Sequence, residues 1–209
     1  MADEPDKLGR YRDKRHFGAT DEPRGADAPS GDDPSFVIQI HDASTMHFDF
    51  RLEVDGVLKS WSVPKGPPAE PSEKRLAVPT EDHPLEYREY EGVIAGGQYG
   101  AGAVIVWDQG TYRPLGDGGD PDSFRRALEH GHASFRLYGT KLRGAFALTR
   151  FRDGTGPEKE AWLLVRKKTG TDGAPHGSAA PDPRRARSAR TGRTLHQVAE
   201  ETARERDEE

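Results

Sequence analysis

The hydrophobic pattern of this chain predicts short β-strands, most clearly over residues 46–54. Every second position of this segment is apolar, and the positions between are polar or charged. That is the period of a strand with two different faces. The apolar face carries Phe48, Phe50, Leu52 and Val54, and the polar face carries His47, Asp49, Arg51 and Glu53. The segment therefore predicts one face in a core and one face available for chemistry.

A hairpin is expected next, because Asp55-Gly56 is a strong signal for a two-residue turn. The returning strand spans residues 57–63. Its register places Val57 opposite Val54, Trp61 opposite Phe50, Val63 opposite Phe48, Ser60 opposite Arg51 and Ser62 opposite Asp49. Small residues beside charged ones predict a pocket on the polar face.

Further strands are expected at residues 36–41, 75–78, 103–107, 133–138, 144–151 and 161–168. One helix is expected at residues 123–130, with Asp122 or Ser123 as its N-cap and Gly131 directly after its C-terminus. Residues 8–17 predict a short helix or an extended arm, and residues 194–206 predict a helix. The fold class is mainly β, a barrel or sandwich of short antiparallel strands with one or two flanking helices.

Composition divides the chain into three zones. Residues 1–33 form a polar, partly flexible N-terminal arm, and residues 34–169 hold nearly all the aromatic and β-branched residues. Residues 170–209 predict a flexible, linker-like tail, in which residues 184–193 include five arginines and no acidic residue. Such a run is typical of a solvated tail that adds non-specific attraction for phosphates.

The whole chain has 31 basic and 36 acidic residues, a net charge of −5, which excludes a simple basic protein that coats DNA. Cysteine is absent, which excludes disulfides and a thiolate nucleophile. The longest apolar runs are too short to span a membrane, and the acidic N-terminus is unlike a signal peptide. We therefore expect a cytoplasmic, monomeric protein without membrane contacts.

One group of residues carries a clear chemical pattern. His47 and Asp49 share the polar face of one strand, and His41 ends the neighbouring strand across a tight turn. Two imidazoles and a carboxylate suit Mn, Fe or Zn and leave coordination positions open. Arg51, one step along, would bind an anionic group there. The alternative is a solvated sheet face that happens to carry these polar residues.

Other candidates lie on loops of the same zone. Lys65 lies in a proline-rich stretch and Arg75 begins a strand, and taken alone both are better explained as ordinary surface charge. His83 is a candidate general acid with Tyr87 four residues further on, and the alternative is a turn residue capped by Asp82. The glycine-rich residues 92–102 match no nucleotide-binding pattern and predict close backbone packing or a bulge.

Four segments of the chain resemble a known protein family. The segments FVIQIHDASTMHFDFRLE (36–53), WSVPKGP (61–67), EDHPLEY (81–87) and EGVIAGGQYGAG (91–102) are similar to the 3′-phosphoesterase domain of bacterial ATP-dependent DNA ligase D and its stand-alone relatives. The resemblance implies a compact β-barrel. It also implies a divalent-metal enzyme, with Mn²⁺ preferred and Co²⁺ as an alternative. That enzyme would remove 3′-terminal ribonucleosides and 3′-phosphates from primer–template ends in DNA end joining.

The resemblance also assigns roles by position. It implies metal ligation by His41, His47 and Asp49, catalytic or phosphate-binding roles for Arg51, Arg75, Lys65, His83, Tyr87 and Arg15, and substrate contacts for Gln39, Glu22 and His16. Of these, Arg15, His16 and Glu22 come from the similar segment KRHFGATDE (14–22). The family commonly has an acidic residue where this chain has His16, and a histidine cannot supply the same negative charge.

Residues 188–199 resemble the connector that follows this domain in the multidomain ligases, so the tail is a vestigial linker or a docking segment for a separate ligase or polymerase.

Two alternative functions stay open. A catalytically weak module that binds or scaffolds 3′ ends would use the same residues with little turnover. A non-haem iron oxygenase would use the same two histidines and carboxylate, although the long motif match argues against it.

Overall fold

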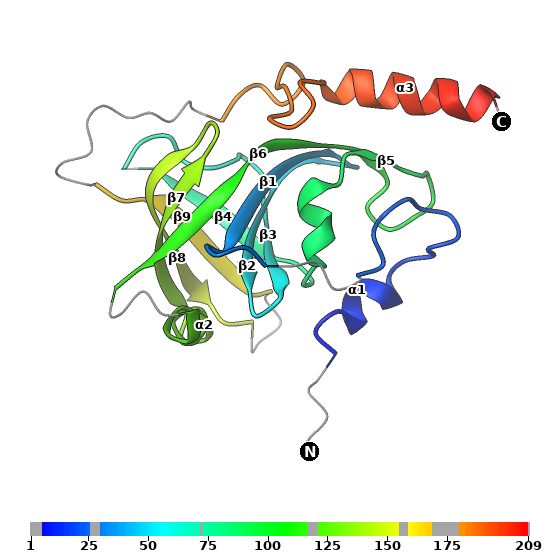
Figure 1. Ribbon diagram of the computed structural model, residues 1–209. Coiled ribbons are helices and arrows are strands. Elements are labelled where there is room, and N and C mark those ends of the chain that lie inside the picture. Colours follow the sequence, from blue (N-terminus) through cyan, green and yellow to red (C-terminus); the bar gives the residue numbers. More distant parts are fainter. Residues whose placement is uncertain are drawn as a thin grey trace.

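A computed structural model describes residues 6–25, 30–71, 73–116, 121–154, 159–168 and 180–208. Its strands are β1 (Ser35–Asp42), β2 (Met46–Val54), β3 (Val57–Val63), β4 (Lys74–Pro79), β5 (Gly92–Ile94), β6 (Gly102–Leu115), β7 (His132–Gly139), β8 (Arg143–Arg152) and β9 (Ala161–Arg166). Its helices are α1 (Gly9–Asp13), the 3-10 helix η1 (Leu85–Glu89), α2 (Pro121–Glu129) and α3 (Leu195–Glu208). Figure 1 shows α2 below the barrel, α3 across its top, and α1 and η1 on one flank.

The strands close into an antiparallel barrel. They follow the order β1-β2-β3-β4-β9-β8-β7-β6, and β6 pairs back with β1, so the described residues form a closed eight-stranded ring. Strand β5 pairs with β6 as an extension beside the ring. Closure removes exposed sheet edges. Of the two sequence-based alternatives, the structure therefore confirms the barrel.

The β2–β3 hairpin has the register that the Asp55-Gly56 turn predicts. Val54 pairs with Val57, Phe50 with Trp61, and Phe48 with Val63. Asp55 and Gly56 have φ values of 51° and 75°, and two positive φ values in succession match a type I′ turn, whose twist suits the strands. Because a slip of one residue would reverse every side chain, this turn decides which face of β2 carries the polar residues.

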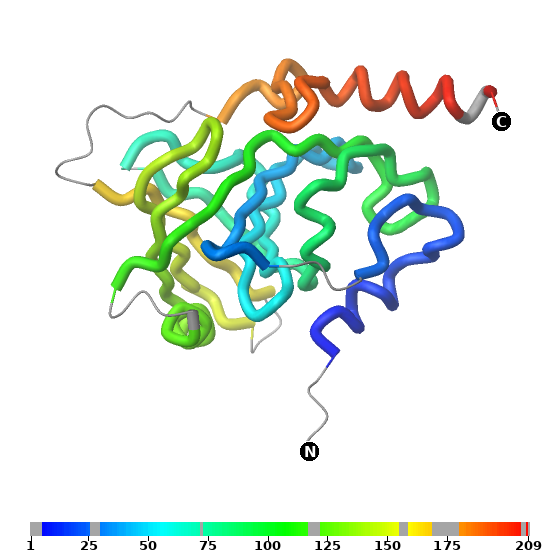
Figure 2. Tube along the Cα trace, viewed as in Figure 1, coloured from blue at the N-terminus to red at the C-terminus, as the bar shows by residue number. Residues whose placement is uncertain are grey.

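The barrel wall is covered on both sides near β1. Ile38 and Ile40 of β1 belong to the interior core, whereas Val37 packs outside with Tyr11 of α1 and Leu85 of η1. This double burial explains why residues 36–41 are almost continuously apolar. Figure 2 shows the blue N-terminal arm beside the green segment that contains η1, with both outside the barrel.

Several expected elements differ in extent. Strand β6 continues to Leu115, well beyond the expected end at Trp107, and the sequence analysis did not predict η1 or β5. Helix α2 begins at Pro121, so the expected N-caps Asp122 and Ser123 lie inside its first turn. Proline is favoured at that first position because it has no N–H to satisfy. Gly131 does follow the helix with a φ of 86°.

The described part of the expected tail does not run free of the barrel. Ala186, Leu195 and Val198 are buried in the main core. Helix α3 begins after Thr194, whose side-chain oxygen accepts from the Gln197 N–H while the Gln197 side chain accepts from the Thr194 N–H, a reciprocal cap. The sequence analysis expected a flexible tail here, whereas these apolar and capping residues connect residues 180–208 to the barrel. Residues 170–179 lie outside the described part, and the division into zones stays a prediction.

Within the described residues, no helix combines the length and the apolar character that crossing a membrane requires.

A tight contact between β6 and the end of β1 gives a prediction about Gly102. Its φ is 140°, and a Cβ placed there would lie 2.0 Å from the carbonyl oxygen of Asp42. We expect Gly102→Ala to lower the free energy of unfolding by about 1–3 kcal/mol or more, because a side chain is strained there whatever the neighbours do. Urea unfolding measures this. Gly96→Ala is the matched control, since nothing lies within 4 Å of that position, and equal stability of the two variants would contradict the expectation.

Candidate active site

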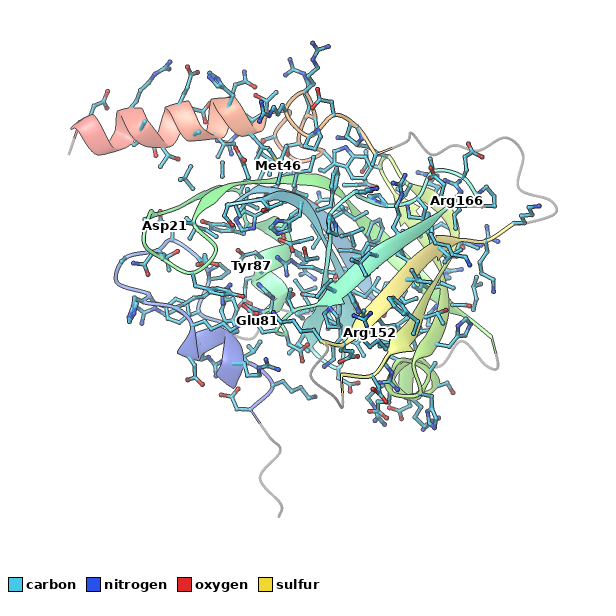
Figure 3. All side chains as sticks on the ribbon, turned by 180° about the vertical axis from the view of Figure 1, so that it is seen from behind. Asp21, Met46, Glu81, Tyr87, Arg152 and Arg166 are labelled. Atoms are coloured by element: carbon cyan, nitrogen blue, oxygen red, sulfur yellow. The ribbon has the colours of Figure 1, made fainter. Side chains whose placement is uncertain are left out.

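The polar face of β2 lies outside the barrel, beneath a layer made by η1, the N-terminal arm and the loop after β5. Asp49 and Arg51 project from β2 on this face, and Gln39 and His41 project from β1 beside them. Tyr87 and Glu81, labelled in Figure 3, belong to the covering layer. The charged residues are therefore buried rather than solvated, and the structure contradicts the alternative of a solvated sheet face.

His41, His47 and Asp49 form a compact group. The His41 Nδ1 atom lies 3.6 Å from Asp49 Oδ2, and the His47 Nε2 atom lies 3.5 Å from Asp49 Oδ1. One candidate ligand atom from each residue falls within 4.8 Å of the other two. The group lies at one end of β1 and β2, and His47 is its most exposed side chain.

The other ring nitrogens are already engaged. His41 Nε2 donates to the carbonyl oxygen of Gly100 at 2.7 Å, and His47 Nδ1 donates to the carbonyl oxygen of Thr45 at 2.8 Å. Carbonyl partners fix the rings and leave the opposite nitrogens as lone-pair donors, as in the outer shell of protein metal sites. With the Asp49 carboxylate, this donor set fits a divalent ion such as Mn, Fe or Zn.

The charge of Asp49 is held in place electrostatically. Burial alone would raise the pKa of this carboxyl, but Arg51 and the two histidines more than offset that effect and hold its pKa well below the usual range. The pKa of His47 is raised, because the contact with Asp49 outweighs the opposing effect of burial. Asp49 is thus a carboxylate at neutral pH.

Arg51 connects this group to the rest of the site. Its guanidinium donates to Asp49 Oδ2 at 3.1 Å, to Gln39 Oε1 at 2.8 Å and to Ser60 Oγ at 2.9 Å. Gln39 in turn donates to the carbonyl oxygens of Tyr87 and Tyr90, both at 3.0 Å. The small residue expected opposite Arg51 is therefore a hydrogen-bond partner.

His83 lies between two guanidinium groups. Its Nδ1 donates to the carbonyl oxygen of Glu81, two residues earlier, at 2.8 Å, and its Nε2 lies 3.4 Å from Arg15 Nη2. Arg51 Nη1 lies 3.1 Å from His83 Nδ1. Burial, together with these two cations, lowers the pKa of His83 well below its usual value. Asp82 pairs with Lys59 at 2.6 Å, so the cap expected in the alternative interpretation of His83 does not form.

The N-terminal arm is fastened by a buried ionic network. Arg15 pairs with Glu22 at 2.9 Å and with Glu81 at 3.1 Å. Tyr87 donates to Glu22 at 2.9 Å, and burial next to that carboxylate raises the pKa of Tyr87 well above its usual value. Lys14 pairs with Glu81 at 2.9 Å. The sequence analysis assigned no role to Glu81, although it begins one of the matched motifs.

Three expected site residues are not brought into these contacts. His16 and Lys65 are exposed, and no described contact joins their side chains to the candidate metal-ligating group of His41, His47 and Asp49. Arg75 pairs with Glu73 at 3.1 Å, and its buried Nε has no partner among the described residues. The roles that the resemblance implies for these three residues stay predictions.

Fold and site together define the class: a β-barrel with a two-histidine, one-carboxylate centre beside buried cations. The chain belongs to the family described as the DNA ligase D 3′-phosphoesterase domain, which matches residues 39–150. It is 49% identical over 166 residues to the multifunctional non-homologous end joining protein LigD of Pseudomonas aeruginosa, covering 78% of this chain and 19% of that protein.

Mycobacterial relatives give the same result. The LigD protein of Mycobacterium tuberculosis is 44% identical over 174 residues, covering 82% of this chain and 21% of that protein. That of Mycolicibacterium smegmatis is 40% identical over 188 residues, covering 85% and 23%. The chain thus spans about a fifth of the length of the curated relatives it matches. These comparisons confirm the expected family.

The ionic network predicts a pH-dependent contribution from Glu81. Burial would raise the pKa of this carboxyl, but Lys14 and Arg15 lower it overall from a usual value of 4.5. Glu81 therefore stabilises the folded protein above pH 4.5, and this contribution is lost as the pH falls through the lower folded-state pKa. We expect Glu81→Gln to cost about 1.5–3 kcal/mol at pH 7.

Urea unfolding of both proteins between pH 7 and pH 3 tests this. The difference between wild type and Glu81→Gln should shrink below pH 4.5. Glu70→Gln, at an exposed position, is the control and should match the wild type at pH 7. A Glu81→Gln deficit that stays constant down to pH 3 would exclude the linkage.

Proposed function

We propose that this chain is a metal-dependent 3′-end phosphoesterase that removes 3′-phosphates and 3′-terminal ribonucleosides from nucleic-acid ends to leave a 3′-OH. The observation that carries the proposal is the placement of the His41, His47 and Asp49 group next to the buried Arg51 guanidinium. A divalent cation and a guanidinium at one place suit an anion with several oxygens, such as a phosphate ester. The family match supports the same reaction class.

The proposed cofactor is Mn²⁺, with Co²⁺ as an alternative, held by His41 Nδ1, His47 Nε2 and an Asp49 oxygen. A bound divalent ion would polarise the phosphoryl group and offset its charge. Arg51 would orient a phosphate oxygen and stabilise the charge that builds up in the transition state. Its hydrogen bonds to Gln39 and Ser60 hold the guanidinium in one orientation, so this part of the site is organised before substrate binds.

His83 would act on the leaving or attacking oxygen. With its pKa lowered, this imidazole is neutral at pH 7 before substrate binds, and its Nε2 is an acceptor. A phosphate dianion beside Arg51 and Arg15 would offset their charge and favour protonation of His83. His83 would then be able to donate a proton to the departing oxygen. Tyr87 and Glu22 hold Arg15 in place for this role.

The relatives are named as non-homologous end joining proteins. We propose that this chain acts in the same process on DNA or DNA/RNA primer–template ends, before a polymerase or ligase uses the 3′-OH. Residues 188–199, which resemble the connector of the multidomain ligases, fold against the barrel through their first turn of α3.

The proposal predicts the behaviour of His47→Ala. We expect this variant to lose Mn²⁺ affinity by more than about 100-fold, beyond the effect typical of outer-shell partners. We also expect it to lose conversion of duplexes that end in a 3′-phosphate or in one 3′-ribonucleotide. Electron paramagnetic resonance of free Mn²⁺ measures the affinity, and gel analysis of labelled strands measures conversion.

His132→Ala is the matched control, because this exposed histidine lies on β7 outside the metal-ligating group. It should bind Mn²⁺ and convert both substrates as the wild type does. Undiminished conversion by His47→Ala would overturn the metal assignment. Mn²⁺ binding and duplex binding by the wild type without any conversion would favour the alternative of an end-binding module.

A further inference from the structure

The C-terminal strap, residues 180–194, crosses one end of the barrel. The Ala180 Cβ lies 2.7 Å from where a Cβ of Gly66 would be, so its methyl group occupies the space beside that glycine. Lys141, in the β7–β8 turn, donates to the carbonyl oxygen of Arg187. The Ala189 N–H donates to the Val106 carbonyl at 2.8 Å. Figure 1 shows the strap, in orange, passing above β6 before α3 begins.

This end of the barrel is the one that carries the metal-ligating group. Strand β2 begins there at Met46, beside His47, and its partner β3 ends there at Val63. Gly66 comes three residues after the end of β3, so the contact between Ala180 and Gly66 connects the strap to that end. Figure 3 labels Met46 at the same edge, beneath the strap.

Two arginines of the strap are anchors. Arg190 pairs with Glu89 of η1 at 2.8 Å. Arg193 pairs with Glu91 at 3.3 Å and with Glu201 of α3 at 2.6 Å. Glu91 is buried and also accepts from the Val106 N–H at 2.8 Å. These contacts fix the strap against the layer that covers the site.

The other three arginines of the run, Arg184, Arg185 and Arg187, face solvent. The Arg185 side chain is 89% exposed and lies 3.8 Å from an exposed Asp182 carboxylate. Across the described part of the chain, no carboxylate lies within 4 Å of Arg184 or Arg187, and Arg187 donates one hydrogen bond to the carbonyl of Gly192. Ala186 and Ser188, on either side of Arg187, are buried and fix the backbone, so three guanidinium groups are displayed in a defined order.

Such a display fits a row of phosphates. A guanidinium pairs with phosphate oxygens in a planar, bidentate manner and stays charged at all relevant pH values. Exposed Lys65, Lys74 and Arg143 extend the positive charge around the same barrel end. The chain as a whole is acidic, with a net charge of −5, so attraction for a polyanion must come from a local surface. An acidic protein would be drawn to the same charges, but the neighbouring phosphoester chemistry favours nucleic acid.

We propose that Arg184, Arg185 and Arg187 bind the sugar–phosphate backbone of the nucleic acid whose 3′ end enters the metal centre. The inference rests on the proposed function, because that function places the 3′ end of the nucleic acid at the metal centre. The three arginines themselves lie outside the catalytic contacts. The strap contributes charge without base-reading contacts, so binding is independent of sequence. In this arrangement Arg190 and Arg193 hold the strap and the other three arginines hold the duplex.

The test is binding of the full-length chain to a labelled 20-base-pair duplex with a recessed 3′-phosphate, measured by fluorescence anisotropy in EDTA. The variant is Arg184→Gln/Arg185→Gln/Arg187→Gln. We expect affinity to fall at least about tenfold at 100 mM salt and the salt slope of log K to become smaller by about 3, roughly one per lost phosphate contact. Conversion of a 3′-phosphorylated dinucleotide, too short to reach the strap, should keep its kcat.

The matched control is Arg113→Gln/Arg126→Gln/Arg152→Gln, which removes the same charge from exposed positions on β6, α2 and β8 toward the opposite end of the barrel. It should retain wild-type affinity and slope. Wild-type affinity and salt slope in the strap variant would overturn the proposal. If the triple strap variant unfolds, Arg184→Gln/Arg185→Gln replaces it, with an expected slope change of about 2. Because EDTA excludes turnover, failure of the phosphoesterase assay leaves this outcome readable.

Discussion

Burial of the Arg51 guanidinium constrains the whole site. A guanidinium keeps its charge at any pH that a folded protein meets, so placing one under a protein layer requires acceptors around it. Here the acceptors come from three adjacent strands: Gln39 on β1, Asp49 on β2 and Ser60 on β3. A slip of one residue in any of these strands would turn its acceptor into the barrel core. The strand register and the geometry of the site are therefore the same constraint.

This arrangement also sets the charge of the site. Arg51 and Arg15 approach His83 from two sides, and Asp49 and Glu22 neutralise each cation in part. The guanidinium groups of Arg51 and Arg15 therefore supply positively charged donors within the site, although the chain as a whole has a net negative charge. The arm that brings Arg15 is held by the carboxylates of Glu22 and Glu81 and by the buried ring of Tyr11. An anionic substrate would therefore compete with those carboxylates for the same cation, which couples the position of the arm to occupancy of the site.

Much of the fold was accessible from the sequence because the signals were local. The alternation over residues 46–54 and the Asp55-Gly56 turn predicted the hairpin and its register, and both are confirmed. Closure into a barrel was not accessible from the residues alone, because it depends on β6 pairing with β1 across more than sixty positions of the chain. The end of β6 was missed because residues 108–111 are polar or glycine and interrupt the apolar pattern, although Tyr112 after them is buried in the core.

The site was predicted as far as side chains determine it. The candidate metal-ligating group follows from strand alternation and one tight turn, but the partners of its two rings are the backbone carbonyls of Thr45 and Gly100, which residue type does not reveal. The arginine run, residues 184–193, also shows what residue type alone does not reveal. Its composition resembles a solvated tail, yet Glu89 and Glu91, about a hundred residues earlier, hold two of its members. Charge patterns predict attraction, and only the fold decides which charges are consumed as anchors and which remain available to a ligand.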